Sequence, residues 1–162
     1  MSVAPDDFKK ALSCWATGVT IVTARAGDRV HGMTVSAFSE VSLDPPLVLV
    51  CVDKTSNTHP LVAEGGVFAV NVLSRDQTAL AKRFASKQDE HRRFIGLEYE
   101  SGKTGAPLLV GTAAALDCSL VDAHEAGDHV IYVGRVEWMR SSEREPLIYH
   151  RTAYRVLADV NS

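Results

Sequence analysis

Seven hydroxyl-bearing side chains fall between His31 and Pro60, in a segment whose other residues are typical of strands. They are Thr34, Ser36, Ser39, Ser42, Thr55, Ser56 and Thr58. Hydroxyls on core strands need hydrogen-bond partners, so this segment is either a strand pair with one wet face or a surface that holds a polar ligand. Hydroxyls and backbone amides at a strand-to-helix turn can hold a phosphate.

The stretch VDKTSNTHP, residues 52–60, has the form of such a turn. A buried strand ends at Asp53, and hydroxyls precede the expected start of a helix. A simpler explanation is also open, because Ser56 or Asn57 could merely cap that helix. The pattern alone does not choose between a cap and a phosphate site.

Three further groups could contribute to a site. Lys82 and Arg83 in ALAKRFAS could pair with a phosphate, or could form a solvated helix face. His129 follows a turn at Gly127, where it could orient a carboxamide or phosphate, donate a proton, or simply lie on the surface. The tail segment Tyr149-His150-Arg151 could close a site or form a polar rim.

Other kinds of site have no support in the sequence. No GxGxxG or GxxxxGK[ST] motif is present, so neither a Rossmann dinucleotide site nor a P-loop is expected. The histidines share no metal-ligand spacing, and we expect no metal. Cys14, Cys51 and Cys118 form an odd set without a CxxC pair, which indicates free thiols in a reducing cytoplasm.

The bulk composition is that of one globular domain. The 162 residues are 46% hydrophobic and 23% charged, with a net charge of −3 and no run of basic residues. These values argue against nucleic-acid binding. The N-terminal segment does not resemble a secretory signal, and no apolar run is long enough to span a bilayer. We therefore expect a cytoplasmic protein with no membrane partner.

Helices are expected in three places. Asp6 or Asp7 could cap an amphipathic helix over 8–17, which Gly18 would end. A second short helix should run from Ser56 or Asn57 toward Glu64, and a third should begin at Ser74 or Asp76 and face Leu80 and Phe84 inward. The charged stretch 88–107 reads as a loop.

Strands account for most of the remaining chain. A hairpin is expected over 18–25 and 30–38, and a buried strand should start at Leu47, after Pro45 and Pro46. Further strands are expected at 67–74, in a long hairpin that turns at Ala126-Gly127-Asp128, and in the tail. Six or seven mostly antiparallel strands with short helices predict a mainly β fold, an antiparallel barrel with peripheral helices.

Four separated segments together resemble the flavin reductase family, which has the FMN-binding split-barrel fold with Greek-key-like connections. They are GMTVSAFSEVSLDPPLVLVCVDKTSNT, FAVNVLS, ALAKRF and HEAGDHVIYVGRV. The resemblance covers about residues 8–157 and implies one flavin reductase-like domain over 1–162. It implies a homodimer that transfers hydride from NADH or NADPH to FAD or FMN and supplies reduced flavin to a partner flavin-dependent monooxygenase.

The same resemblance implies roles for individual residues. His129 would orient the nicotinamide as the catalytic residue. The expected flavin contacts are Thr34, Val35, Ser36 and Ala37 along the ring, Cys51, Val52 and Asp53 flanking it, Lys54, Ser56, Asn57 and Thr58 near the ribityl chain and phosphate, and Arg83 and Phe84 at the phosphate or adenylate end, with Tyr149 and Arg151 enclosing the nicotinamide. Hydride transfer is the cofactors' own chemistry, which explains the lack of a catalytic triad.

Two alternatives and one departure remain open. The chain could be an electron carrier that holds FMN tightly with little NAD(P)H turnover. An oxidase of a phosphorylated pyridoxine-type substrate on a related barrel is less well supported, because no dense arginine and lysine cluster is visible. Glu40 stands where the family pattern favours a small hydroxyl residue, and near the flavin its charge would disfavour the reduced anion. The sequence does not distinguish FAD from FMN, NADH from NADPH, or a permanently bound flavin from one that exchanges as a substrate.

Overall fold

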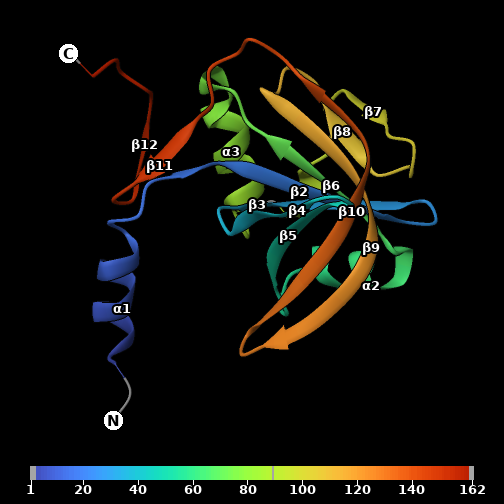
Figure 1. Ribbon diagram of the computed structural model, residues 1–162, viewed down its shortest axis with the longest axis horizontal. Coiled ribbons are helices and arrows are strands. Elements are labelled where there is room, and N and C mark those ends of the chain that lie inside the picture. The colour runs from blue at the N-terminus through green and yellow to red at the C-terminus, as the bar shows by residue number, and fades with distance from the viewer. Residues whose placement is uncertain (1–2, 89, 161–162) are drawn as a thin grey trace.

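A seven-stranded antiparallel sheet, curled into a barrel, forms the centre of the computed structural model (Figure 1), which describes residues 3–88 and 90–160. Its strand order is β3-β2-β6-β9-β10-β5-β4. These strands are β2 (Thr20–Ala26), β3 (Arg29–Val35), β4 (Phe38–Leu43), β5 (Pro46–Asp53), β6 (Val67–Val72), β9 (Ala114–Ala126) and β10 (His129–Ser141). The predicted mainly β, antiparallel fold is confirmed.

Two small sheets and three helices surround the barrel. The small sheets contain β1 (Thr17–Gly18), β11 (Ile148–His150) and β12 (Ala153–Arg155), and β7 (Tyr99–Ser101) with β8 (Pro107–Leu109). The helices are α1 (Pro5–Leu12), α2 (Thr58–Gly65) and α3 (Thr78–Ala85), with 3-10 turns η1 (Arg75–Gln77) and η2 (Glu90–Arg92). No helix in the described part of the chain is long and apolar enough to cross a membrane.

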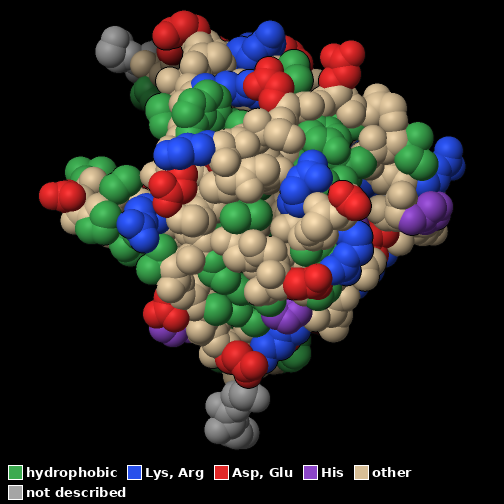
Figure 2. All heavy atoms as spheres, turned by 90° about the vertical axis from the view of Figure 1, so that its right-hand side faces the viewer, with side chains coloured by type: hydrophobic (Ala, Val, Ile, Leu, Met, Phe, Trp, Pro, Cys, Tyr) green, Lys and Arg blue, Asp and Glu red, His purple; other side chains and the backbone are tan. Residues whose placement is uncertain are grey.

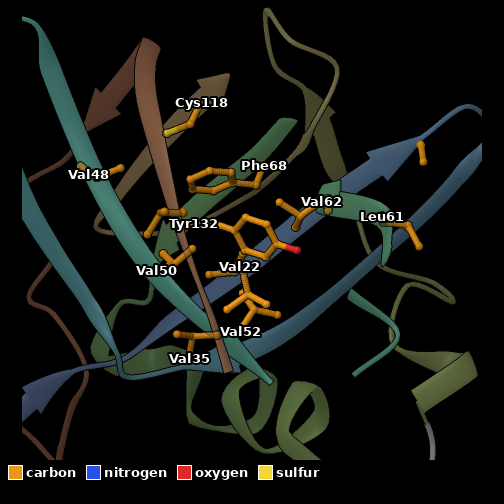
Figure 3. Packing of buried hydrophobic residues seen from close by; sticks show 14 residues of the cluster. Val22, Val35, Val48, Val50, Val52, Leu61, Val62, Phe68, Cys118 and Tyr132 are labelled. Atoms are coloured by element: carbon orange, nitrogen blue, oxygen red, sulfur yellow. The ribbon is translucent and has the colours of Figure 1, made fainter. Parts of the chain in front are cut away.

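Every second side chain along β5 and the first half of β10 points into the barrel and fills its interior. Val48, Val50 and Val52 point inward from β5, since they are buried while the residues between them are only half-buried. Tyr132 of β10 lies among these side chains (Figure 3), and its hydroxyl is 2.6 Å from His59 Nδ1 at the start of α2. This hydrogen bond satisfies the one polar group of a buried ring, and burial raises the pKa of Tyr132.

The outer face of the same two strands is also apolar. Leu49 lies directly opposite Val133, and Cys51 lies opposite Ile131. All four are half-buried. On the face of the molecule shown in Figure 2, by contrast, basic and acidic side chains are interspersed.

Several sequence-based boundaries were wrong. Helix α1 covers Pro5–Leu12, so Asp6 and Asp7 lie in its first turn instead of capping it, and it ends well before Gly18. Proline is favoured in the first turn of a helix, which explains the earlier start. No residue of α1 is buried, and in Figure 1 the helix stands away from the barrel.

Two predicted segments are divided differently in the structure. The strand expected over 30–38 ends at Val35, and β4 begins at Phe38 after a two-residue break. The stretch 88–107, expected as a loop, contains η2, β7 and the first residue of β8. Phe94, Leu97 and Tyr99 pack there against a buried cluster, so tertiary contacts order a segment with weak local signals.

Candidate functional site

The two segments predicted to contact the flavin, residues 34–37 and 51–58, touch each other. The Cys51 amide donates a hydrogen bond of 3.0 Å to the carbonyl oxygen of Ala37, which joins β5 to the break between β3 and β4. Ser36 and Ala37 are exposed at that break, and Cys51 is half-buried. Residues far apart in sequence therefore form one surface.

Three adjoining cavities run along this surface. The first, about 190 Å³, and the second, about 200 Å³, share Thr34, and the second shares Ser36 and Tyr149 with a third of about 530 Å³. We call this series the groove. Its walls come from β3, the β3–β4 break, the turn after β5, α3 and β11.

One end of the groove is polar. The polar residues that line the first cavity are Asp53 at the end of β5, Thr55 and Ser56 from the turn after it, and Lys87, Glu90 and Arg93 from the segment after α3. The Asp53 carboxylate accepts hydrogen bonds from the Thr55 amide at 2.7 Å and the Thr55 hydroxyl at 2.8 Å. These bonds lower the pKa of Asp53.

Ser56 acts as a structural cap in this turn. Its hydroxyl donates to the Asp53 carbonyl at 2.8 Å and accepts the His59 amide at 3.2 Å. The simpler of the two sequence explanations therefore holds for the Ser56 hydroxyl, although Ser56 also lines the first cavity. Asn57 stands at the N-cap position of α2 but makes no side-chain capping bond.

Arg93 is a buried cation at the wall of the first cavity. It is only 3% exposed, and its guanidinium donates to the carbonyls of Gly32 and Ser86, both at 2.8 Å. Its Nε has no partner among the residues that the structure describes. Burial lowers the pKa of Arg93, and the nearby Glu90 carboxylate opposes this shift. The unsatisfied Nε is consistent with a site that accepts a polar ligand.

The other end of the groove is apolar with a cationic edge. The third cavity is lined by Leu12 and Trp15 from and just after α1, by Ala37 and Phe38, and by Lys9 and Arg151 among others. Thr17 also lines it, and the buried Thr17 hydroxyl has no partner among residues 3–88 and 90–160. A flat ring system with polar edges fits such a lining.

His129 lies at the tip of the long β9–β10 hairpin. Its Nδ1 is 2.7 Å from the Asp128 carboxylate, and His129 pairs with Asp53 across β10 and β5. The hydrogen bond and the charge of His129 lower the pKa of Asp128. His129 itself lines none of the three groove cavities.

The groove contains about half of the predicted contact residues. Thr34, Ser36, Ala37, Asp53, Ser56, Phe84, Tyr149 and Arg151 line one or more of its cavities. Val35 and Val52 are buried, and Cys51, Lys54 and Asn57 line none of the three cavities.

Two predicted residues have other partners. Thr58 is fully buried, and its hydroxyl is 2.8 Å from His31 Nδ1. The Arg83 guanidinium donates to the carbonyls of Arg92 at 2.7 Å and Ile95 at 2.5 Å. Their ligand contacts stay predictions, as does the effect of Glu40, which is exposed on the edge strand β4 and lines no groove cavity.

Sequence reasoning missed several groove residues. Arg93 lies in the stretch 88–107 that was predicted as a loop, and Lys87 lies just before it, at the end of the predicted third helix. Lys9, Trp15 and Thr17 lie in or just after the first helix, whose role was not foreseen. The only sequence signal for Arg93 is its position directly before the apolar anchor Phe94.

Comparisons with known proteins identify the family of this chain. Residues 12–158 match the family model described as flavin reductase like domain. The chain is 42% identical to "FMN reductase (NADH) SmoA" of Agrobacterium fabrum over 91% of this chain and 83% of that protein. It is 36% identical to "Flavin-dependent monooxygenase, reductase subunit HsaB" of Rhodococcus jostii over 94% of this chain and 78% of that protein.

A solved structure of a flavin oxidoreductase has the same fold as this chain. The NADH:FAD oxidoreductase SgcE6 of Streptomyces globisporus, in complex with NAD and FAD fragments, superposes with a TM-score of 0.88 at 34% identity. The alignment covers 98% of this chain and 97% of that one.

Proposed function

The chain belongs to the flavin reductase-like domain family, and we propose that it is an NAD(P)H-dependent flavin reductase that passes reduced FAD or FMN to a partner monooxygenase. The observation that carries the proposal is the continuous groove, which joins a polar end at Arg93 to an apolar end at Trp15. A flavin has the matching form, with phosphate at one end and a flat ring at the other.

The residues present fit a flavin substrate. The phosphate end would lie near Thr55, Ser56, Lys87 and Arg93, and the ring would lie toward Ser36, Ala37 and Tyr149. When bound, the flavin accepts a hydride with its two electrons from the reduced nicotinamide, which is thereby oxidised. The protein has to hold the two rings in contact and exclude water from between them.

His129 would orient the nicotinamide carboxamide. A bond between its Nδ1–H and the Asp128 carboxylate would fix the tautomer, so that Nε2 becomes a hydrogen-bond acceptor for a carboxamide N–H. His129 then positions the donor and does not need to take up a proton. The relatives named as reductases favour turnover over the alternative of a tightly held FMN in an electron carrier.

The test is a matrix of anaerobic assays with NADH or NADPH crossed against FAD, FMN and riboflavin. We expect at least one pair to turn over many times per protein molecule, with the reduced flavin released. A sample that stays yellow through dialysis but barely oxidises either dinucleotide would overturn the proposal. Adding a flavin-dependent monooxygenase to the reaction should then couple dinucleotide oxidation to substrate oxygenation.

We also propose that the protein is a homodimer that works in the cytoplasm. The apolar outer face of β5 and β10, with Leu49 opposite Val133, supports an interface, because such faces are normally covered. The free thiols of Cys14, Cys51 and Cys118 suit a reducing compartment. Sedimentation velocity should give a dimer in the wild type and a monomer in Val133→Asp. A wild-type monomer would contradict the interface.

A further inference from the structure

The hairpin turn between β11 and β12 has a strained backbone. Arg151 and Thr152 have φ values of +49° and +62°, and they are the non-glycine residues with positive φ among residues 3–88 and 90–160. Left-handed backbone is uncommon for such residues and is a marked outlier for a β-branched threonine. Strain of this kind gathers at functional sites, where the surrounding structure maintains it.

This turn is fastened to the end of α1. The Arg151 amide donates a hydrogen bond of 2.9 Å to the Ser13 carbonyl oxygen. Ser13, Arg151 and Thr152 then line both the apolar third cavity and a neighbouring cavity of about 280 Å³. Arg151 is thus the cation that stands where the two cavities meet.

The charge around this junction is unbalanced. Lys9 lines the third cavity and Lys10 lines its neighbour, and neither cavity has an Asp or Glu in its lining. In the part of the chain that the structure describes, no carboxylate lies within ion-pair distance of Lys9, Lys10 or Arg151. Lysines in the last turn of a helix also complement the helix dipole, but Arg151 lies outside the helix and needs another reason.

From this arrangement we propose that Arg151, flanked by Lys9 and Lys10, binds a phosphate of the nicotinamide dinucleotide. The inference rests on the proposed function, since it takes the rings to occupy the groove. A guanidinium presents a planar fork that matches phosphate oxygens, and the two lysines add point charges beside it. The phosphate is either the pyrophosphate, which NADH and NADPH share, or the 2′-phosphate, which only NADPH carries.

The decisive experiment compares hydride donors with and without phosphate. Arg151→Gln should raise the KM for the dinucleotide about tenfold and leave kcat nearly unchanged, because a charge-assisted contact is lost. With 1-benzyl-1,4-dihydronicotinamide, which carries no phosphate, the variant should match the wild type. Arg151→Lys should recover part of the affinity. The matched control is Arg155→Gln, an exposed arginine on the next strand that lines neither cavity.

The pattern of losses identifies the phosphate. An equal rise in KM for NADH and NADPH assigns Arg151 to the pyrophosphate, and a rise for NADPH alone assigns it to the 2′-phosphate. An equal loss with the benzyl donor would overturn the proposal in favour of a structural role. A KM that rises for FMN but not for riboflavin would show that Arg151 binds the flavin phosphate instead, and would overturn the proposal. An unchanged KM, or the same loss in Arg155→Gln, would also overturn it.

Binding measured without turnover separates this inference from the proposed function. Trp15 lines the third cavity, so titration with NAD+ or NADP+ should change tryptophan fluorescence. The Kd should rise in Arg151→Gln even if the wild type were inactive. If no dinucleotide binds the wild type while the benzyl donor reduces flavin, the phosphate site is wrong and the reductase activity stands. If Arg151→Gln does not fold, Arg151→Lys and the double variant Lys9→Gln/Lys10→Gln carry the same test.

Discussion

His129 lies directly opposite Asp53 where β10 pairs with β5. The register thereby joins the tip of the β9–β10 hairpin to the hydroxyl-rich turn that forms the polar end of the groove. The two residues are 76 positions apart in the sequence, because most of the barrel lies between them along the chain.

The first prediction concerns His129→Ala. Loss of the imidazole should raise the KM for NADH or NADPH about tenfold. The neutral hydrogen bond between the nicotinamide carboxamide and His129 would be lost, and with it the orientation of the ring. The affinity for oxidised flavin, measured by fluorescence titration, should stay largely unchanged. His124→Ala, an exposed histidine of the same hairpin, is the control. Weaker flavin binding with an unchanged KM for the dinucleotide would show that the assignment is reversed.

The second prediction concerns the buried guanidinium of Arg93. Arg93→Met keeps much of the side-chain volume but leaves the carbonyls of Gly32 and Ser86 without their donors. The free energy of unfolding should fall by about 2 to 3 kcal/mol. Urea denaturation measures this change. Arg92→Met, which alters an exposed neighbour, should stay within about 0.5 kcal/mol of the wild type.

The third prediction concerns the strain at Thr152. Glycine adopts positive φ without a Cβ penalty, so Thr152→Gly should raise the free energy of unfolding by about 0.5 to 1 kcal/mol despite the entropy that glycine adds to the unfolded chain. Thermal unfolding should show a higher midpoint. The same change at Thr104, which bonds the Asp117 carboxylate, should lower stability instead. A lower midpoint for Thr152→Gly would mean that the turn is not strained.

The fourth prediction concerns pH and His31. Burial and the charge of Arg93 lower the pKa of His31 below its usual value of 6.5, with Glu90 opposing the shift. The folded state therefore binds its proton less readily than the unfolded chain. This contribution to stability is complete above about pH 6.5 and is lost as the pH falls below it toward the folded-state pKa.

A variant isolates this contribution. His31→Gln keeps a side chain that can bond the Thr58 hydroxyl but does not titrate. Between about pH 7 and pH 5, its free energy of unfolding should fall less steeply than that of the wild type. His91→Gln, at an exposed position, should leave the slope unchanged. Equal slopes in wild type and His31→Gln would exclude His31 as the titrating group.

Much of the fold could be predicted because its signals are local. The β-branched runs, the turn at Gly127 and the apolar stretch after Pro46 specify strands and a long hairpin through backbone preferences. Local signals did not predict the 3-10 turn and the strand residues within 88–107. The order of this stretch comes from the packing of Phe94 and Tyr99 against distant residues, which no local pattern records.

By itself the sequence determined the antiparallel barrel, the family, and the two hydroxyl-rich segments around Thr34 and Ser56. Only the tertiary structure decided that the Thr58 hydroxyl bonds His31 and lines no groove cavity, because that contact joins residues far apart in sequence and depends on how α2 packs against β3. The positions of Arg93 and Arg151 were also decided there. Strand register and loop packing bring their charges to opposite ends of one groove, and neither depends on sequence spacing.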